Sequence, residues 1–263
     1  MRTLQTCLLA LAVLPVGLAL AAEGGARIAG KPDFNGTWDN GGGIDFLKPQ
    51  KLADGSVCVS NCPQPGGGPP PPRAAVVPDK PVYKPQFQAK VDALKKAQQR
   101  EDPVLRCRPP GVPRIGPPDK IVQTAREAVF LYEDVSGPFF RIVPLDGQSH
   151  RGDDSDTFLG DAVGHWDGDT LVVVTSNFNE ETWLTDDGAF HSPKLKVTER
   201  IRRSAPDALE WSAIVEDADV LTQPWALRPR RMVSTSVEMA EPAPCVEQDM
   251  QHMVDDTYHS NPR

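Results

Sequence analysis

The sequence lacks the signatures of the commonest enzyme classes. It has no Gly-x-Ser-x-Gly elbow, no P-loop, no dinucleotide-binding glycine motif and no His-Glu-x-x-His pair. It also has no long run of lysine or arginine, and its 263 residues carry a formal net charge of −8. Such a chain is poorly suited to bind nucleic acids or anionic membrane surfaces. We therefore expect neither a common hydrolase, kinase or dehydrogenase nor a nucleic-acid-binding protein.

Long apolar runs are scarce as well, and the one present lies at the start of the chain. Arg2 precedes the apolar run Leu8–Leu20, and Ala19-Leu20-Ala21 has the small-x-small pattern of a signal-peptidase site. The run is too short to cross a bilayer as a mature helix. We expect residues 1–21 to be a cleaved signal peptide. The mature chain is then periplasmic or secreted, with no stable membrane insertion after cleavage.

Cysteine is rare, with five in the chain and four once Cys7 is removed. An even number in an exported chain favours disulfides. Cys58 and Cys62 lie close together, whereas Cys107 and Cys245 flank the region richest in expected strands. We predict the pairs Cys58–Cys62 and Cys107–Cys245, among the three connectivities that four cysteines allow. Zinc binding is the weaker alternative, because the spacing matches no zinc pattern.

Composition divides the chain into segments. Residues 22–32 are predicted to be a flexible leader, residues 33–247 a single β-rich domain and residues 248–263 a polar tail. Within the domain, residues 54–85 are rich in proline and glycine, which predicts a surface loop, and residues 86–100 are predicted to form a helix. The helix is indicated by apolar residues at near-helical spacing: Phe87, Val91, Leu94 and Ala97.

After the helix, short apolar runs alternate with turn residues, which predicts a series of strands. The expected strands cover residues 34–38, 121–124, 128–135, 139–145, 163–166, 170–178, 195–203, 209–215 and 225–235. Asp167-Gly168-Asp169 and Ala205-Pro206-Asp207 are expected hairpin turns. Only residues 179–194 make a long connection. Eight or nine strands in this order favour a mainly β, antiparallel up-and-down barrel of lipocalin-like type, with one helix inserted near the N-terminal side. A β-sandwich is the alternative.

Two resemblances agree with a barrel. Phe34-Asn-Gly-Thr-Trp38 is similar to the Gly-x-Trp start of lipocalin-type barrels, in which the tryptophan plugs the closed end. The chain also resembles a family of uncharacterised exported bacterial proteins with a lipocalin-like (calycin-type) barrel. The segments that carry this resemblance are residues 33–38, 106–114, 121–124, 164–173, 178–179, 182–184, 191–192 and 199–200. It implies a periplasmic β-rich domain and little about chemistry. Residues 54–72, which look like an insertion, depart from the family pattern, as does Val174-Thr-Ser176.

Strand alternation singles out one acidic residue. Along residues 195–203, Glu199 falls on the face of the apolar side chains, whereas the other face is charged and polar. A carboxylate there is costly unless it is paired or protonated. A protonated carboxyl group could act as a general acid. The alternative is a structural ion pair with Arg141, which shares a face with the apolar residues of the run 139–145.

Polar loops supply further candidates for acid–base chemistry. His150 and Asp154 follow an expected strand, and His191 ends the connection 179–194. With Glu199, they would provide a base, an acid and an orienting carboxylate, while Arg141 or Arg200 would stabilise negative charge on the substrate. Each histidine alone is more often structural than catalytic. A zinc, manganese or iron site is a weaker alternative, with the candidate ligands His150, Asp153, Asp154, Asp156 and His191.

Aromatic and polar residues of the later strands are candidates for ligand binding. The candidates are Trp166, Trp183, Phe178, Asn179 and Arg200. Trp183 lies in the connection 179–194, where it could belong to a lid over a cavity mouth or simply anchor the loop. Trp211 and Trp225 could also line a cavity, although Trp211 alternates with apolar residues and is expected in the core.

These features favour a cofactor-independent periplasmic or secreted enzyme. It would act by acid–base chemistry, as a lyase, isomerase or hydrolase, on a small, partly apolar molecule held in a barrel cavity. The alternative is a non-catalytic carrier of a small ligand, in the lipocalin manner. A weaker hypothesis is an envelope interaction protein that uses the proline-rich loop. These three functions predict different arrangements of titratable groups around the cavity, so the arrangement in the structure can distinguish them.

Overall fold

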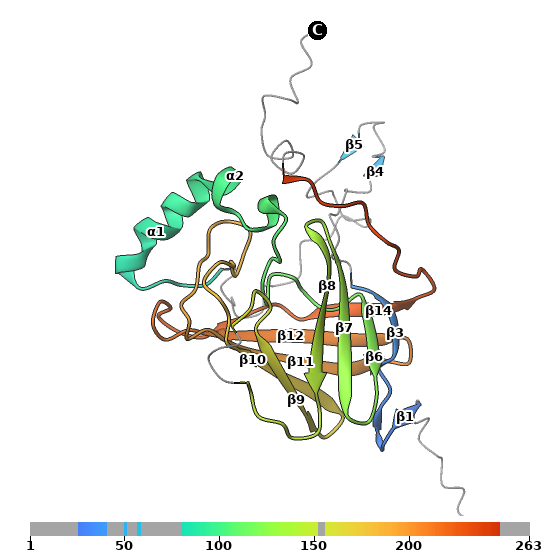
Figure 1. Cartoon of the computed structure of the whole chain (residues 1–263). Coiled ribbons are helices and arrows are strands. Elements are labelled where there is room, and N and C mark those ends of the chain that lie inside the picture. The colour runs from blue at the N-terminus through green and yellow to red at the C-terminus, as the bar shows by residue number, and fades with distance from the viewer. Residues whose placement is uncertain (1–25, 41–49, 52–56, 59–79, 152–155, 248–263) are drawn as a thin grey trace, which may run out of the picture.

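The computed structural model of the chain is a nearly closed antiparallel β-barrel (Figure 1). It describes residues 26–40, 50–51, 57–58, 80–151 and 156–247. Several predicted features lie outside the described residues: the signal peptide 1–21, most of the proline-rich loop, Cys62, Asp153, Asp154 and the polar tail 248–263. The prediction of a mainly β barrel with one inserted helical region is confirmed.

Nine strands make up the barrel sheet. In order around the barrel they are β3 (Gly36–Asp39), β6 (Lys120–Gln123), β7 (Glu127–Asp134), β8 (Gly137–Pro144), β9 (Asp161–Asp167), β10 (Thr170–Ser176), β11 (Lys196–Ala205), β12 (Ala208–Glu216) and β14 (Arg230–Thr235). This order follows the sequence, and every neighbouring pair along the sheet path is antiparallel, as predicted. With nine strands in the path, the two edge strands β8 and β9 run in the same direction. Only β8 and β9, the two edges of the sheet path, form no ladder with each other.

The remaining elements are short. They are β1 (Arg27–Ile28), β2 (Lys31–Pro32), β4 (Gln50–Lys51), β5 (Val57–Cys58), α1 (Pro85–Lys96), α2 (Gln98–Glu101), the 3₁₀ helix η1 (Val104–Arg106) and β13 (Trp225–Ala226), which pairs with β12. The expected helix therefore exists, but Ala97 separates it into two parts. The expected strand 225–235 is also interrupted, because Pro229 has no N–H to donate to a ladder.

The segment expected to be a flexible leader contains a small hairpin. β1 and β2 pair through a turn at Ala29 and Gly30, both of which have positive φ. Arg27 forms an ion pair with Asp169, in the β9–β10 turn, and Lys31 donates to the carbonyl of Gly168. These contacts hold residues 27–32 against the barrel, and the composition of the segment gave no sign of them.

The interior of the barrel is filled by side chains from every second strand position. The largest fully buried ones include Trp211, Tyr132, Phe130, Ile121, Leu171, Ile201, Leu209 and Met232. Trp38 of the Gly-x-Trp motif is buried, and its indole N–H donates to the carbonyl of Phe34. The guanidinium of Arg203 lies 5.9 Å from the ring of Trp38. Burial of these apolar and aromatic surfaces is the main stabilising contribution to the fold.

The helix α1 packs on the long connection between β10 and β11 (Figure 1). The rings of Phe87 and Phe190 meet edge to face, 5.9 Å apart. The close approach requires a glycine at position 188, since a Cβ there would lie 2.7 Å from the backbone nitrogen of Lys95. The connection 179–194 is therefore a fixed part of the core, covered by a helix.

A disulfide fastens the C-terminal part of the described chain. Cys107, directly after η1, is bonded to Cys245, as predicted, and the two residues are 138 positions apart in the sequence. Cys58 lies in β5, and its predicted partner is outside the described residues. None of the helices in the described part of the chain is long and apolar enough to cross a membrane.

Candidate functional site

The predicted face of Glu199 is correct, and the residue is fully buried in the barrel. Its Oε2 lies 2.6 Å from Nη2 of Arg141, which is also buried. The alternation of β8 and β11 turns both side chains inward, where the two charges compensate each other. Burial by itself would lower the pKa of Arg141, but the adjacent Glu199 raises it above the ordinary value of an arginine.

Three further side chains complete this buried network. Arg141 donates through Nη1 to the hydroxyl of Tyr132 and through Nη2 to Oγ1 of Thr175, at 3.0 and 2.7 Å. The second oxygen of Glu199 accepts the indole N–H of Trp211 at 3.1 Å. Each residue comes from a different strand, so the network joins five strands across the interior. Burial also raises the pKa of Tyr132, which keeps its hydroxyl protonated.

The network removes the main argument for Glu199 as a general acid or base. Both carboxylate oxygens already have partners within the core, Arg141 and Trp211. A catalytic carboxyl group must come within hydrogen-bond reach of a substrate proton. The arrangement matches the structural ion pair that the sequence left as the alternative.

His191 is buried and hydrogen-bonded on both sides. Its Nδ1 lies 3.0 Å from the carbonyl oxygen of Ser192, which can only accept, so Nδ1 carries the hydrogen. The hydroxyl of Thr182 is 2.7 Å from Nε2 and donates to it when the ring is neutral. Burial lowers the pKa of His191, although the bond to Ser192 and the charge of Asp217 oppose this shift. His191 thus holds the connection 179–194 together as a neutral side chain.

His150 lies elsewhere, in the loop between β8 and β9. Its Nδ1 is 3.3 Å from Oδ2 of Asp161, which also accepts from the backbone N–H of Arg151 at 2.6 Å. The side chain of Arg151 adds a bond to Oδ1. Burial would raise the pKa of Asp161, but the hydrogen bonds and charge of Arg151 lower it overall. Asp161 therefore organises this loop.

The proposed acid–base constellation is not assembled by any contact in the described structure. No hydrogen bond or ion pair joins Glu199 to His150 or His191, since each of them has other partners. Asp154 is outside the described residues, as is Asp153 of the suggested metal set. Within the described residues, no three His, Cys, Asp or Glu side chains gather closely enough to hold a metal ion.

The predicted ligand-binding residues are spread over the molecule. Phe178 and Trp183 are buried, and Phe178 meets the ring of His191 edge to face. Trp166 packs against Phe34 near the β1–β2 hairpin. The remaining two are Asn179, which accepts from the backbone of Glu181, and Arg200, which forms an outer-face ion pair with Asp167. Trp183 acts as a loop anchor, the alternative to a lid.

A cavity occurs instead at the seam between β8 and β9. At one end the strands are in close contact: a Cβ on Gly164 would lie 2.6 Å from Cδ2 of Leu145 and 2.8 Å from Cγ1 of Val143. Towards the other end a cavity of about 540 Å³ opens between residues 140–144 of β8 and residues 161–163 of β9. This volume is in the range of small-molecule sites.

The seam cavity has an apolar wall and a few polar groups. Its apolar lining includes Phe140, Ile142, Phe158, Leu159 and Val163. Arg141 reaches it from the inner face, and Asp161 borders it from the outer face. The Nε of Arg141 is buried without a hydrogen-bond partner among the described atoms, although buried polar groups are nearly always paired. The cavity thus suits a molecule whose body is largely apolar.

Sequence reasoning found Arg141 but missed the apolar wall. One signal was present: β8 is apolar on both faces, whereas the other face of β11 is charged. Phe140 and Ile142 point outward and are 64% and 52% exposed. Such outward apolar residues next to an unpaired strand edge indicate a binding surface.

Comparisons with protein-family models, curated proteins and solved structures find no match for this chain. The resemblance to a family of exported bacterial proteins therefore stays a prediction.

Proposed function

We propose that the protein binds a small, partly apolar molecule in the seam cavity and does not transform it. The observation that carries this proposal is the cavity of about 540 Å³ at the seam, with its apolar lining. Both oxygens of Glu199 are occupied by Arg141 and Trp211 inside the core, which argues against this carboxylate as a catalytic group. The cavity combines an apolar wall with several polar groups, which suits a partly apolar ligand. An acid–base enzyme has less support, because its proposed base and acid have separate structural partners.

The proposal includes an exported location. The apolar run Leu8–Leu20 is typical of a secretory signal, and disulfides such as Cys107–Cys245 persist in oxidising compartments. The proposed partner is a small molecule, with no nucleic acid and no membrane insertion of the mature chain. An organic cofactor is not part of the proposal.

Titration with the neutral fluorophore N-phenyl-1-naphthylamine tests this proposal. We expect saturable binding, and a loss of affinity of about 10-fold or more in Ile142→Asp, because a charge replaces part of the apolar wall. Ile214→Asp is the matched control. Ile214 lies on β12, outside the seam cavity, and is 42% exposed, similar to Ile142.

The control should bind the fluorophore as the unmodified protein does. Both substitutions are at exposed strand positions, so both variants should fold. Equal loss of affinity in the two variants, or no saturable binding at all, would contradict a ligand site at the seam.

A further inference from the structure

A second cavity lies where β12, β13 and β14 meet the segments 113–116 and 184–186. Its volume is about 570 Å³. Trp225 and Leu227 contribute aromatic and aliphatic lining, and the fully buried Trp211 lies behind it. Its position does not depend on the seam cavity, since the two have no lining residue in common.

The charged groups of this cavity are mostly positive. Three arginines line it, Arg114, Arg228 and Arg230, against one acidic residue, Asp186. A cavity that combines arginine with aromatic walls has the composition of a site for an anion with an apolar body.

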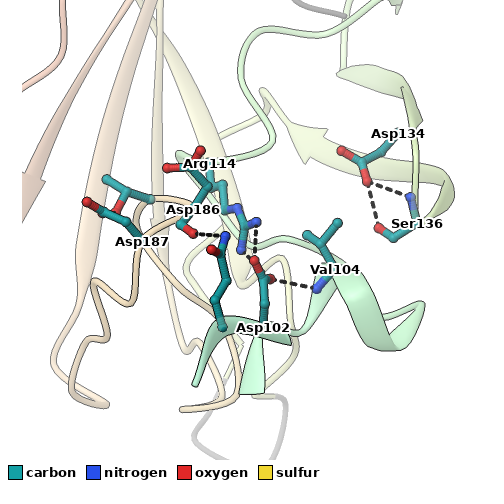
Figure 2. Close-up of polar contacts among 9 residues, drawn as sticks. Asp102, Val104, Arg114, Asp134, Ser136, Asp186 and Asp187 are labelled. Carbon is teal, nitrogen blue, oxygen red and sulfur yellow. Dashed lines mark hydrogen bonds and ion pairs between the residues drawn. The ribbon is translucent and has the colours of Figure 1, made fainter. Parts of the chain in front are cut away.

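Arg114 is already neutralised by an internal partner. Its two terminal nitrogens donate to both oxygens of Asp102, at 2.7 and 2.9 Å (Figure 2). Figure 2 also shows Asp186 joined to the helical region through its backbone carbonyl, which accepts from Gln98. Arg114 therefore shapes the wall of the cavity and is not its principal anion ligand.

Arg230 differs from Arg114 in the partners of its guanidinium group. It faces the same side of the sheet as Trp211, its partner in the β12–β14 register. Its Nη2 donates to two neutral oxygens of Asn40, the carbonyl and the side-chain oxygen, at 3.0 and 3.2 Å. Among the described residues, no carboxylate is in ion-pair contact with Arg230. Burial lowers the pKa of Arg230, and the charge of Asp119 only partly offsets this effect.

Close packing also holds Arg230 at the cavity. A Cβ on Gly116 would lie 2.8 Å from Nη1 of Arg230, so the close approach requires a residue without a side chain there. A partly desolvated guanidinium bonded only to neutral acceptors gains most from an added anion. Because Nη2 already donates to two oxygens of Asn40, an added carboxylate would accept a charge-assisted hydrogen bond from another nitrogen of the guanidinium.

We propose that this cavity, lined by Arg230, Trp211, Trp225 and Leu227, is a second binding site, which takes a small carboxylate with an aromatic or aliphatic body. The carboxylate pairs with Arg230, and the body packs against Trp225 and Leu227. The site is separate from the seam cavity and does not rest on the function proposed for it.

Isothermal titration calorimetry with 2-naphthoate tests the proposal, and the neutral 2-naphthamide has nearly the same shape. We expect saturable binding of 2-naphthoate, weakened about 10- to 100-fold in Arg230→Met because a charge-assisted hydrogen bond is lost. Binding of 2-naphthamide should be weaker and unchanged by this substitution. Arg231→Met is the matched control: Arg231 is the next residue, faces outward and does not line the cavity.

The control should change the affinity for 2-naphthoate less than about twofold, the shift expected from net charge alone. Circular dichroism checks that the variants fold. If Arg230→Met does not fold, Arg230→Lys takes its place, with an expected loss of several-fold because an ammonium cannot keep the bonds to Asn40 and reach the ligand in the geometry of the guanidinium. The absence of saturable binding, or equal losses in Arg230→Met and Arg231→Met, would overturn the proposal.

The Ile142→Asp variant of the seam cavity separates the two sites. It should leave 2-naphthoate binding unchanged, even if it abolishes binding of the neutral fluorophore. If Ile142→Asp weakens 2-naphthoate binding and Arg230→Met does not, the carboxylate occupies the seam cavity and the second site is wrong.

Discussion

Two buried arginine–carboxylate pairs occupy different regions of the molecule. Arg141 and Glu199 meet inside the barrel, 58 positions apart in the sequence. Arg114 and Asp102 meet outside it, in the segment that follows the helices, only 12 positions apart (Figure 2). The inner pair is joined by one Nη2–Oε2 contact and has other partners on three strands, whereas the outer pair is bidentate.

The two pairs differ in whether water can solvate the remaining charge when one partner is removed. The side chains of the inner pair are 2% and 0% exposed, so water cannot replace a missing partner. Arg114 is 13% exposed and borders the second cavity, where water or a ligand can reach it. Pairs of the same chemistry should therefore differ in their importance for stability.

The largest effect is expected for Glu199→Ala. It leaves Arg141 buried and uncompensated, and removes the acceptor of Trp211, so the free energy of unfolding should fall by about 3–5 kcal/mol. Urea denaturation followed by circular dichroism measures this change.

The double variant Arg141→Met/Glu199→Leu is the control for this experiment. It removes both charges and keeps apolar volume, so it should recover much of the loss. Tyr132 and Trp211 lose a partner each, which leaves a residual cost. A single variant that loses less than about 1 kcal/mol would show that the pair is not sealed from water.

A smaller effect is expected for Asp102→Ala. Arg114 can take water in place of the lost carboxylate, so the free energy of unfolding should fall by about 2–3 kcal/mol. Part of this loss comes from the backbone N–H of Val104, which donates to Oδ1 of Asp102 (Figure 2).

The matched control is Asp134→Ala. Asp134 accepts from the backbone and hydroxyl of Ser136 and has no arginine partner in the described structure (Figure 2). Its loss should cost about 1 kcal/mol, the usual value for a turn hydrogen bond. If Asp102→Ala costs as much as Glu199→Ala in the same denaturation assay, exposure does not explain the difference between the two pairs.

The same two pairs show how far the sequence could predict this structure. Glu199 and Arg141 lie on strands, where side chains alternate strictly, so their inward direction followed from the neighbouring residues. Asp102 and Arg114 lie in irregular segments, where no period gives the direction of a side chain. Their bidentate contact could not be predicted from spacing.

The sites were harder to predict than the strands. Turn residues and alternation gave the nine strands of the barrel, because both are local properties of the chain. The seam cavity depends on how β8 and β9 diverge, and the second cavity depends on segments brought together from four parts of the chain. His150 and His191 were candidates because of their residue type alone, since the sequence of a loop does not show where a side chain points. In the structure the two histidines have separate hydrogen-bond partners.

Asp119 extends the comparison to a carboxylate that has no bonded arginine in the described structure. Its oxygens accept from the backbone N–H of Glu133 and from the side-chain amide of Asn40, at 2.7 and 2.8 Å. Burial is the main cause that raises its pKa from 3.8 to about 6. The folded state therefore holds a proton that the unfolded chain has already released over this interval.

The smallest predicted effect is a pH dependence of stability. Because the folded pKa of Asp119 is raised, its favourable contribution is complete below pH ~4 and is lost as the pH rises through about 6. After allowance for its partial exposure, the unfolding free energy should fall by about 1–2 kcal/mol over this interval. In Asp119→Asn this part of the fall should vanish, as urea denaturation at pH 4.5 and 7.0 would show.

Arg230→Met gives the opposite control. The charge of Arg230 lowers the pKa of Asp119, so its removal should raise that pKa further and steepen the fall in stability. An Asp119→Asn variant with the pH dependence of the unmodified protein would mean that this carboxyl group titrates as freely in the fold as in the unfolded chain. Burying a carboxylate without an arginine partner would then cost no more free energy than burying one with such a partner. That result would contradict the comparison of the two pairs.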